Sequence, residues 1–147
     1  MPGAADRLIV NNKQLCLDLM GHGLYNNKSL SLKFPRVPKQ FLKDFIRGVI
    51  DGDGNVRYVN RKRSPYFEIT VSSGSKEFCE GLVKSVSFSL GINAKVRKLI
   101  GNTYIVQYSC RRGLMLGEWI YSSSCLCLNR KHEQYKIALC AKEGGQP

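Results

Sequence analysis

Negative charge is scarce in this chain. Its 147 residues include 11 Asp and Glu against 23 Lys and Arg, which gives a formal net charge of +12 at pH 7. Such a basic excess attracts phosphate regardless of sequence, so nucleic acid is the expected partner and an acidic membrane surface is the alternative. No apolar run is long enough to span a bilayer, and no signal peptide is recognised. We therefore expect a soluble, intracellular protein with no membrane partner.

The chain also lacks a CxxC motif and contains only two histidines. Its six cysteines lie in apolar segments and are expected to be buried free thiols rather than a disulfide framework. They are Cys16, Cys79, Cys110, Cys125, Cys127 and Cys140. A zinc site at Cys125, Cys127 and His132 would need one more ligand. No Ser-His-Asp or Cys-His relay is recognised, and we expect no small-molecule cofactor.

Hydrophobic periodicity predicts one domain in which helices alternate with pairs of strands. Helices are expected over residues 13–20, 39–53, 76–90, 113–122 and 129–141, and extended segments over 7–10, 26–32, 55–63, 66–73, 95–100 and 103–110. This order indicates an α+β fold, in which an antiparallel sheet is backed by helices on one face. The predicted organisation is an N-terminal strand–helix extension over residues 1–38, a main domain over 39–142 and a disordered tail over 143–147. The extension is similar in pattern to part of the main domain and is a possible partial repeat.

Residues 45–54, with the sequence FIRGVIDGDG, form the most informative segment. Gly48 and Gly52 lie one turn apart inside a predicted helix, where each glycine costs roughly 1 kcal/mol relative to alanine. Their missing side chains would let a second helix approach closely on that face. Asp51 and Asp53 end the helix, although a helix C-terminus carries partial negative charge and favours cations. A bound divalent cation would remove this conflict, because carboxylate and carbonyl oxygens are ligands that Mg²⁺ prefers.

Two apolar stripes run along this predicted helix. The first consists of Leu42, Ile46 and Ile50, and the second of Phe41, Phe45, Gly48, Val49 and Gly52. A helix that is apolar on two sides is buried on both. We expect one side to pack on the sheet of its own chain and the other to meet a partner helix.

At these residues the sequence resembles the LAGLIDADG motif of homing endonucleases. Residues 46–54 match closely, and looser agreement extends over residues 8–139. Arg47 and Gly52 depart mildly from the name-giving pattern. The alternatives are a helix that ends in a glycine cap with solvated aspartates, or a calcium loop, which would need oxygen ligands where Val56 stands. The resemblance implies a LAGLIDADG-type α+β domain, whose antiparallel sheet forms a saddle backed by helices.

The resemblance also implies the chemistry. Asp53, with the carbonyl of Gly52, corresponds to the family's metal-binding acid and would hold Mg²⁺ or Mn²⁺ against a scissile phosphate. Residues 128–131 resemble the family's Leu-x-Arg-Lys segment, which makes Lys131 the basic residue that serves the water or the developing charge. Alternatively, Lys131 is an ordinary lysine in the first turn of a helix, an unfavourable place for a cation. Asp51 is expected to support the helix end.

Basic and hydrogen-bonding side chains follow the predicted strands. Because helices cover only one face of the sheet, its polar face is free to read base edges in the major groove. The predicted DNA contacts are Arg57, Asn60, Arg61, Lys62, Arg63, Glu68, Thr70, Ser72, Lys95, Arg97, Lys98, Gln107 and Ser109. Alternation does not settle which face Arg57 takes, because Val56 and Val59 interrupt it. The alternative is a solvated basic face that serves only solubility.

These features predict a site-specific double-strand DNA endonuclease of the homing type that cuts a long, near-palindromic target. One metal carboxylate serves one strand, so a double-strand cut needs a second chain. The homodimer would form through Phe45, Gly48, Val49 and Gly52. The alternative is a DNA- or RNA-binding protein of the same fold that does not cleave, such as an intron maturase or a regulator.

Overall fold

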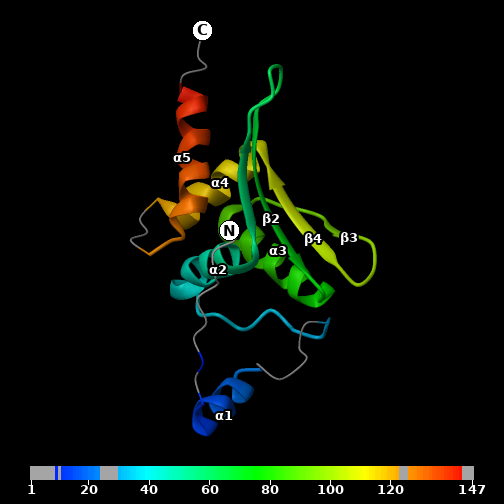
Figure 1. Ribbon diagram of the computed structural model, residues 1–147. Helices are drawn as coiled ribbons and strands as arrows, with labels where there is room; N and C mark the ends of the chain where they lie inside the picture. Colours follow the sequence, from blue (N-terminus) through cyan, green and yellow to red (C-terminus); the bar gives the residue numbers. More distant parts are fainter. Residues whose placement is uncertain (1–8, 10, 24–29, 123–125, 144–147) are drawn as a thin grey trace, which may run out of the picture.

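The computed structural model describes residue 9 and residues 11–23, 30–122 and 126–143. This part of the chain has five helices and four strands (Figure 1). The helices are α1 (Lys13–Gly21), α2 (Lys39–Asp53), α3 (Lys76–Leu90), α4 (Cys110–Tyr121) and α5 (Asn129–Glu143). The strands are β1 (Asn55–Val59), β2 (Tyr66–Ser73), β3 (Val96–Lys98) and β4 (Tyr104–Ser109). No described helix is both long and apolar enough to cross a membrane.

The four strands form one antiparallel sheet in the order β1-β2-β4-β3, which confirms the predicted α+β fold. β1 is shorter than the strand expected over residues 55–63. Val59 pairs with Tyr66, the first residue of β2, so residues 60–65 form the connection. Pro65 has no N–H with which to extend the ladder.

Helices cover one face of the sheet, and the burial pattern of β2 identifies that face. Phe67, Ile69 and Val71 are each at most 2% exposed, as their alternation predicts. The residues of α2 that join the same core are Leu42, Ile46 and Ile50. Burial of each such side chain contributes about 1.5–3 kcal/mol relative to exposure. The first apolar stripe of α2 therefore packs within its own chain, as predicted.

α4 begins at Cys110, earlier than the predicted start at Gly113. Cys110 has a φ of 54°, and this left-handed residue turns the chain from β4 directly into the helix. A Cβ at Gly113 would lie 2.8 Å from the carbonyl oxygen of Tyr108 and 3.1 Å from that of Phe67. Glycine at this position therefore allows α4 to lie close against β2 and β4.

α1 forms as predicted, and the side chain of Asn12 caps it by accepting a hydrogen bond from the N–H of Leu15 at 3.0 Å. No residue of α1 is buried, and the helix stands apart from the sheet in Figure 1. The predicted strand over residues 7–10 and the predicted tail over 143–147 lie almost wholly outside the described residues. The same holds for most of the extended segment predicted over 26–32.

The connector between α1 and α2 packs on the main domain. The hydroxyl of Ser75 donates a hydrogen bond to the carbonyl oxygen of Leu32 at 2.6 Å. Phe34 fits closely over α3, where a Cβ at Gly81 would lie 2.2 Å from the Cβ of Phe34. The connector is therefore held by the main domain, although the division at residue 38 stays a prediction.

The expectation of buried thiols is correct for only one described cysteine. Cys79 is buried and Cys127 is half-buried, whereas Cys16, Cys110 and Cys140 are exposed. All five are free thiols, as predicted, and the sixth cysteine lies outside the described residues. The three exposed cysteines lie on helices, on sides that face away from the core. Apolar neighbours in the sequence do not show which side of a helix a residue occupies.

Candidate functional site

The motif helix ends in an exposed acidic turn. α2 ends at Asp53, and Gly54 closes it by donating its N–H to the carbonyl oxygen of Ile50 at 2.9 Å. Both Gly52 and Asp53 are exposed, and the last turn of α2 carries no basic residue. Within the described part of the chain, no hydrogen bond or ion pair engages the Asp53 carboxylate. The carboxylate thus stands at the negative end of the helix dipole without a cation from its own helix.

Lys131, from the first turn of α5, reaches the same helix end. The residue is 2% exposed. Its Nζ donates hydrogen bonds to the carbonyl oxygens of Ile50 at 2.6 Å, Asp51 at 2.8 Å and Gly54 at 2.5 Å. An ammonium group has three donors, so all of its protons are used. The positive charge meets the carbonyls at the negative end of α2, including that of Ile50, which also accepts the N–H of Gly54.

This contact explains why a cation is tolerated at the start of α5. The family resemblance predicts the Lys131 amine beside a scissile phosphate, and the structure brings it to the turn that carries Asp53 but directs it to backbone carbonyls. The pKa of Lys131 is lowered, first by burial and then by the charge of Arg130, while Asp51 and Asp53 act in the opposite direction. A positive charge is unfavourable in the first turn of α5. The negative end of α2, which is remote in sequence, stabilises this charge.

Asp51 ties three segments together. One carboxylate oxygen accepts a hydrogen bond from the Tyr121 hydroxyl at 2.9 Å, and the other accepts one from the N–H of Leu128 at 3.0 Å. These bonds join the end of α2 to the end of α4 and to the segment before α5. The expectation that Asp51 supports the helix end is confirmed.

The candidate zinc site already placed Cys127 near His132, but nothing in the sequence indicated that Tyr121 joins them. The His132 ring stacks on Tyr121 with a centroid distance of 5.2 Å and an interplanar angle of 25°. Its Nδ1 lies 3.4 Å from the Cys127 sulfur. No sequence signal could have paired Tyr121 with His132, because they lie on separate helices. Cys125 lies outside the described residues, and the described part contains no group of three His, Cys, Asp or Glu that could hold a metal.

The donors expected for a divalent cation are the Asp53 carboxylate and the Gly52 carbonyl. Both are hard oxygen ligands on an exposed turn. Lys131 engages other carbonyls of this turn and leaves that of Gly52 without a hydrogen bond from any described residue. Mg²⁺ is commonly held by one or two carboxylates together with waters and phosphate oxygens. This donor set therefore fits a magnesium ion that is completed from outside the chain.

The face of the sheet opposite the helices carries most of the predicted DNA contacts. We call it the polar face, and those contacts on it are Arg57, Glu68, Thr70, Ser72, Arg97, Gln107 and Ser109. Arg57 pairs directly with Glu68, so the register settles the orientation that alternation left open. The guanidinium of Arg57 and the carboxylate of Glu68 form an ion pair at 2.5 Å.

The remaining predicted contacts lie at the margins of the sheet. Asn60, Arg61, Lys62 and Arg63 are exposed in the connection between β1 and β2. The guanidinium carbon of Arg61 lies 5.3 Å from the centroid of the Tyr66 ring, a cation–π contact. Lys95 is exposed just before β3. Lys98 pairs with Tyr104 on the opposite face, so the expectation that it shares the polar face is wrong, because side chains alternate along a strand.

Gly48 and Gly52 form an open strip on α2, called here the glycine strip. A Cβ at either position would meet no atom within 4 Å. Val49 beside them is half-buried. Phe45 is also half-buried, and its ring packs edge-to-face on Phe34 at 5.4 Å, so it borders the strip. No described residue of the chain supplies the predicted partner helix for this strip.

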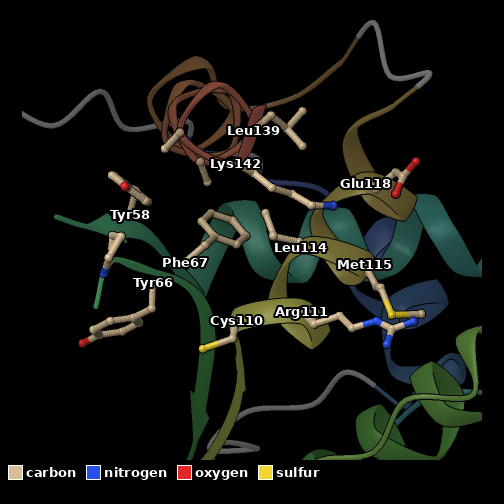
Figure 2. A pocket seen from close by; sticks show the side chains of 13 residues that line it. Tyr58, Tyr66, Phe67, Cys110, Arg111, Leu114, Met115, Glu118, Leu139 and Lys142 are labelled. Carbon is tan, nitrogen blue, oxygen red and sulfur yellow. The ribbon is translucent and has the colours of Figure 1, made fainter. Parts of the chain in front are cut away.

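A cavity of about 750 Å³ lies between the β1–β2 connection, α4 and the end of α5 (Figure 2). Phe67, Leu114 and Leu139 contribute apolar walls, and Glu118 and Lys142 contribute charged groups. None of the predicted site residues lines this cavity. The cavity therefore contains none of the groups expected to hold a metal or DNA.

Comparison with protein families identifies the fold around these residues. The family model of the LAGLIDADG-like domain matches residues 40–126, which include the whole sheet and all of α2 but its first residue. The crystal structure of the homing endonuclease I-TnaI superposes with a TM-score of 0.53 at 18% identity, over 70% of this chain and 74% of that one. The homing endonuclease I-CvuI, solved in complex with its target, gives a TM-score of 0.49 at 21% identity, over 69% of this chain and 65% of that one.

A curated protein shares a shorter segment. The probable translation initiation factor IF-2 of Methanocaldococcus jannaschii is 42% identical over 59 residues. The match covers 37% of this chain and only 5% of that protein.

Proposed function

Because this chain belongs to the family of LAGLIDADG-like domains, we propose that it is a site-specific endonuclease that binds duplex DNA on the polar face and cuts it with a divalent cation. The observation that carries the proposal is the position of Asp53. It ends α2 as an exposed carboxylate two residues before β1, the strand that carries Arg57 on the polar face. The proposed metal-binding residue is therefore close in sequence to the strand that begins the proposed DNA-binding face.

Asp53 and the carbonyl of Gly52 would hold Mg²⁺ or Mn²⁺. When bound, the cation would supply charge that stabilises the phosphate under attack and acidifies a coordinated water. The chain itself holds the Asp53 turn in place through two neighbouring anchors. Lys131 fixes the backbone carbonyls of this turn, and Asp51 fastens it to α4.

Lys131 is our candidate for the basic residue beside this site. Its ammonium donates all three protons to carbonyls, so it would act on the developing charge through its own positive charge rather than by proton transfer. The amine would contribute from its position at the carbonyl end of α2, where it also fixes the turn. A shift of the alkaline limb of the pH–rate profile in Lys131→Arg would support this role, and an unchanged profile would contradict it.

The glycine strip is the proposed homodimer contact. Each chain offers one Asp53, whereas cleavage of both strands of a duplex needs two metal-binding centres. Two copies of α2 packed across Gly48 and Gly52 would bring both centres to a twofold axis. A symmetric dimer of this kind would read a near-palindromic target.

The second candidate is a nucleic-acid-binding protein of the same fold that does not cleave. The observation in its favour is that Asp51 and Lys131 both have structural contacts that explain their presence without catalysis. The polar face would then bind DNA or RNA, and Asp53 would be a solvated carboxylate.

Incubation of the purified chain with a randomised duplex library separates the two candidates. Reactions would contain Mg²⁺, Mn²⁺ or a chelator, and all cut ends would be sequenced. A recurrent cut site on both strands that depends on the metal and is lost in Asp53→Asn would support the endonuclease. Binding without cleavage in both metals would establish the second candidate, and failure to bind any duplex at low salt would overturn the proposal.

A further inference from the structure

Glu68 is a buried carboxylate on the uncovered face of the sheet. It is 3% exposed, although none of the described helices covers this side, because the side chains of Arg57 and Gln107 enclose it. One carboxylate oxygen accepts a hydrogen bond from Nε of Arg57 at 2.5 Å. The other accepts one from Nε2 of Gln107, also at 2.5 Å.

The chain of hydrogen bonds continues across the sheet. Arg97 donates from Nη2 to Oε1 of Gln107 at 2.5 Å. The four residues form a polar row that crosses the strands from β1 through β2 and β4 to β3. Glu68 lies directly opposite Arg57, whereas the other two links are diagonal, a separation that long side chains can bridge.

The row determines which groups remain available to a ligand. Glu68 uses both oxygens, and Gln107 uses its carbonyl oxygen and donates from its amide nitrogen to Glu68. Arg57 and Arg97 use one nitrogen each, and a guanidinium has five donors. The row therefore presents guanidinium donors at its two ends and has no free amide oxygen in the middle.

Guanine offers two acceptors in the major groove, O6 and N7, which suit a guanidinium fork. Adenine offers an acceptor beside a donor, a pattern that a side-chain amide such as that of Gln107 reads when its oxygen and nitrogen are both free. A carboxylate that faced DNA without partners would repel phosphate, and the row neutralises Glu68. Holding both arginines before binding also reduces the side-chain entropy lost on association.

We propose that Glu68 is a positioning residue that makes the sheet select guanine at two positions of its target, read by Arg57 and Arg97, and that prevents Gln107 from reading adenine. This inference rests on the proposed binding of duplex DNA. The two arginines lie on the outer strands β1 and β3, which three strand spacings separate by about 14 Å. Each defines its own base position in the target.

Selection of bound duplexes from a randomised library in chelator, where no cut can occur, tests the inference. The wild-type chain is expected to enrich guanine at two separate positions. Glu68→Gln preserves shape but breaks the charge pair, and guanine enrichment at both positions is expected to fall about tenfold, since a bidentate contact discriminates by about 1–3 kcal/mol. Total duplex affinity is expected to stay equal or rise, because one negative charge is lost. Glu77→Gln on α3 is the matched control and is expected to leave the profile unchanged.

Single substitutions assign the two positions. Arg57→Lys is expected to lose one guanine preference and Arg97→Lys the other, because lysine lacks the bidentate fork. Gln107→Ala is expected to weaken the guanine preference only at the base position that Arg97 reads. If Glu68→Gln does not fold, this variant tests whether the hydrogen-bonded row sets the guanine preference.

Three results would overturn the inference. In the first, the wild type selects guanine, but Glu68→Gln and Gln107→Ala both keep the wild-type profile. In the second, the chain binds duplexes without any base preference, because the arginines contact only phosphates. In the third, no duplex binds, and the proposed function fails together with the inference.

Discussion

The Nζ of Lys131 lies 2.6 Å from the carbonyl oxygen of Ile50 and joins the start of α5 to the end of α2. The two residues are 81 positions apart in the sequence. The ammonium thereby covers the negative end of the helix that carries Asp53. Its contribution to stability can be measured separately from any contribution to cleavage.

Lys131→Met should lower the free energy of unfolding by about 3 kcal/mol, because hydrogen bonds from a charged donor to buried carbonyls are lost. Lys136→Met on the same helix is the control. Lys136 forms an exposed ion pair with Glu133, so its loss should change stability by less than about 0.5 kcal/mol. Urea denaturation of both variants provides the comparison. Equal stabilities would show that the carbonyl contacts of Lys131 are not stabilising.

Asp53→Asn should reduce cleavage without reducing stability, whereas Asp51→Asn should reduce stability. Asp53 is exposed, and no hydrogen bond or ion pair joins its carboxylate to a described residue, so its variant should fold with nearly unchanged stability and bind duplex while cleavage falls by at least about a hundredfold. Asp51 accepts two hydrogen bonds, and its variant should lose about 2 kcal/mol. Thermal melts and single-turnover cleavage separate the two effects. Normal cleavage by Asp53→Asn would show that the metal-binding acid lies elsewhere.

Gly48→Leu should separate dimerisation from folding. The Cβ has open space, and leucine is a better helix former than glycine by about 0.8 kcal/mol, so the monomer should be as stable as the wild type or slightly more so. The added bulk should hold two copies of α2 apart and abolish the dimer and double-strand cleavage together. Lys84→Leu adds the same side chain at an exposed position of α3 and should leave the dimer intact. Light scattering with and without DNA tests this, and a Gly48→Leu dimer that still cuts would exclude the glycine strip as the interface.

Tyr121→Phe should change how the free energy of unfolding depends on pH above the ordinary tyrosine pKa. Burial, and then the hydrogen bond to Asp51, raise the pKa of Tyr121 above its ordinary value of 10.0. The folded phenol therefore stays neutral where the unfolded one ionises, so its contribution is complete below pH 10 and falls as the pH rises further. Above that pH, stability should fall less steeply in Tyr121→Phe by about 1.4 kcal/mol per pH unit. Urea unfolding from pH 9 to about pH 11 measures both slopes, and parallel slopes would contradict the assignment.

The sequence by itself determined the elements that carry strong local signals. The bounds of α2, β2 and α3 agree with the prediction, because periodicities of 3.6 and 2 residues and the Ser75 cap of α3 mark them. The position of Asp53 at the end of α2 follows from the motif alone. The end of β1 and the start of α4 lack such a signal, and the prediction placed the former four residues too late and the latter three residues too late.

Only the tertiary structure decided how the site residues meet. Lys131 contacts Ile50, and Glu68 contacts Gln107, across 81 and 39 positions of sequence. Neither pairing leaves a periodic trace, since each depends on which elements the fold places side by side. The face of Lys98 likewise depends on register, because a shift of one residue in pairing exchanges the two faces of a strand. Local sequence specifies the helices and strands, whereas burial and long-range hydrogen bonds specify which polar groups those elements bring together.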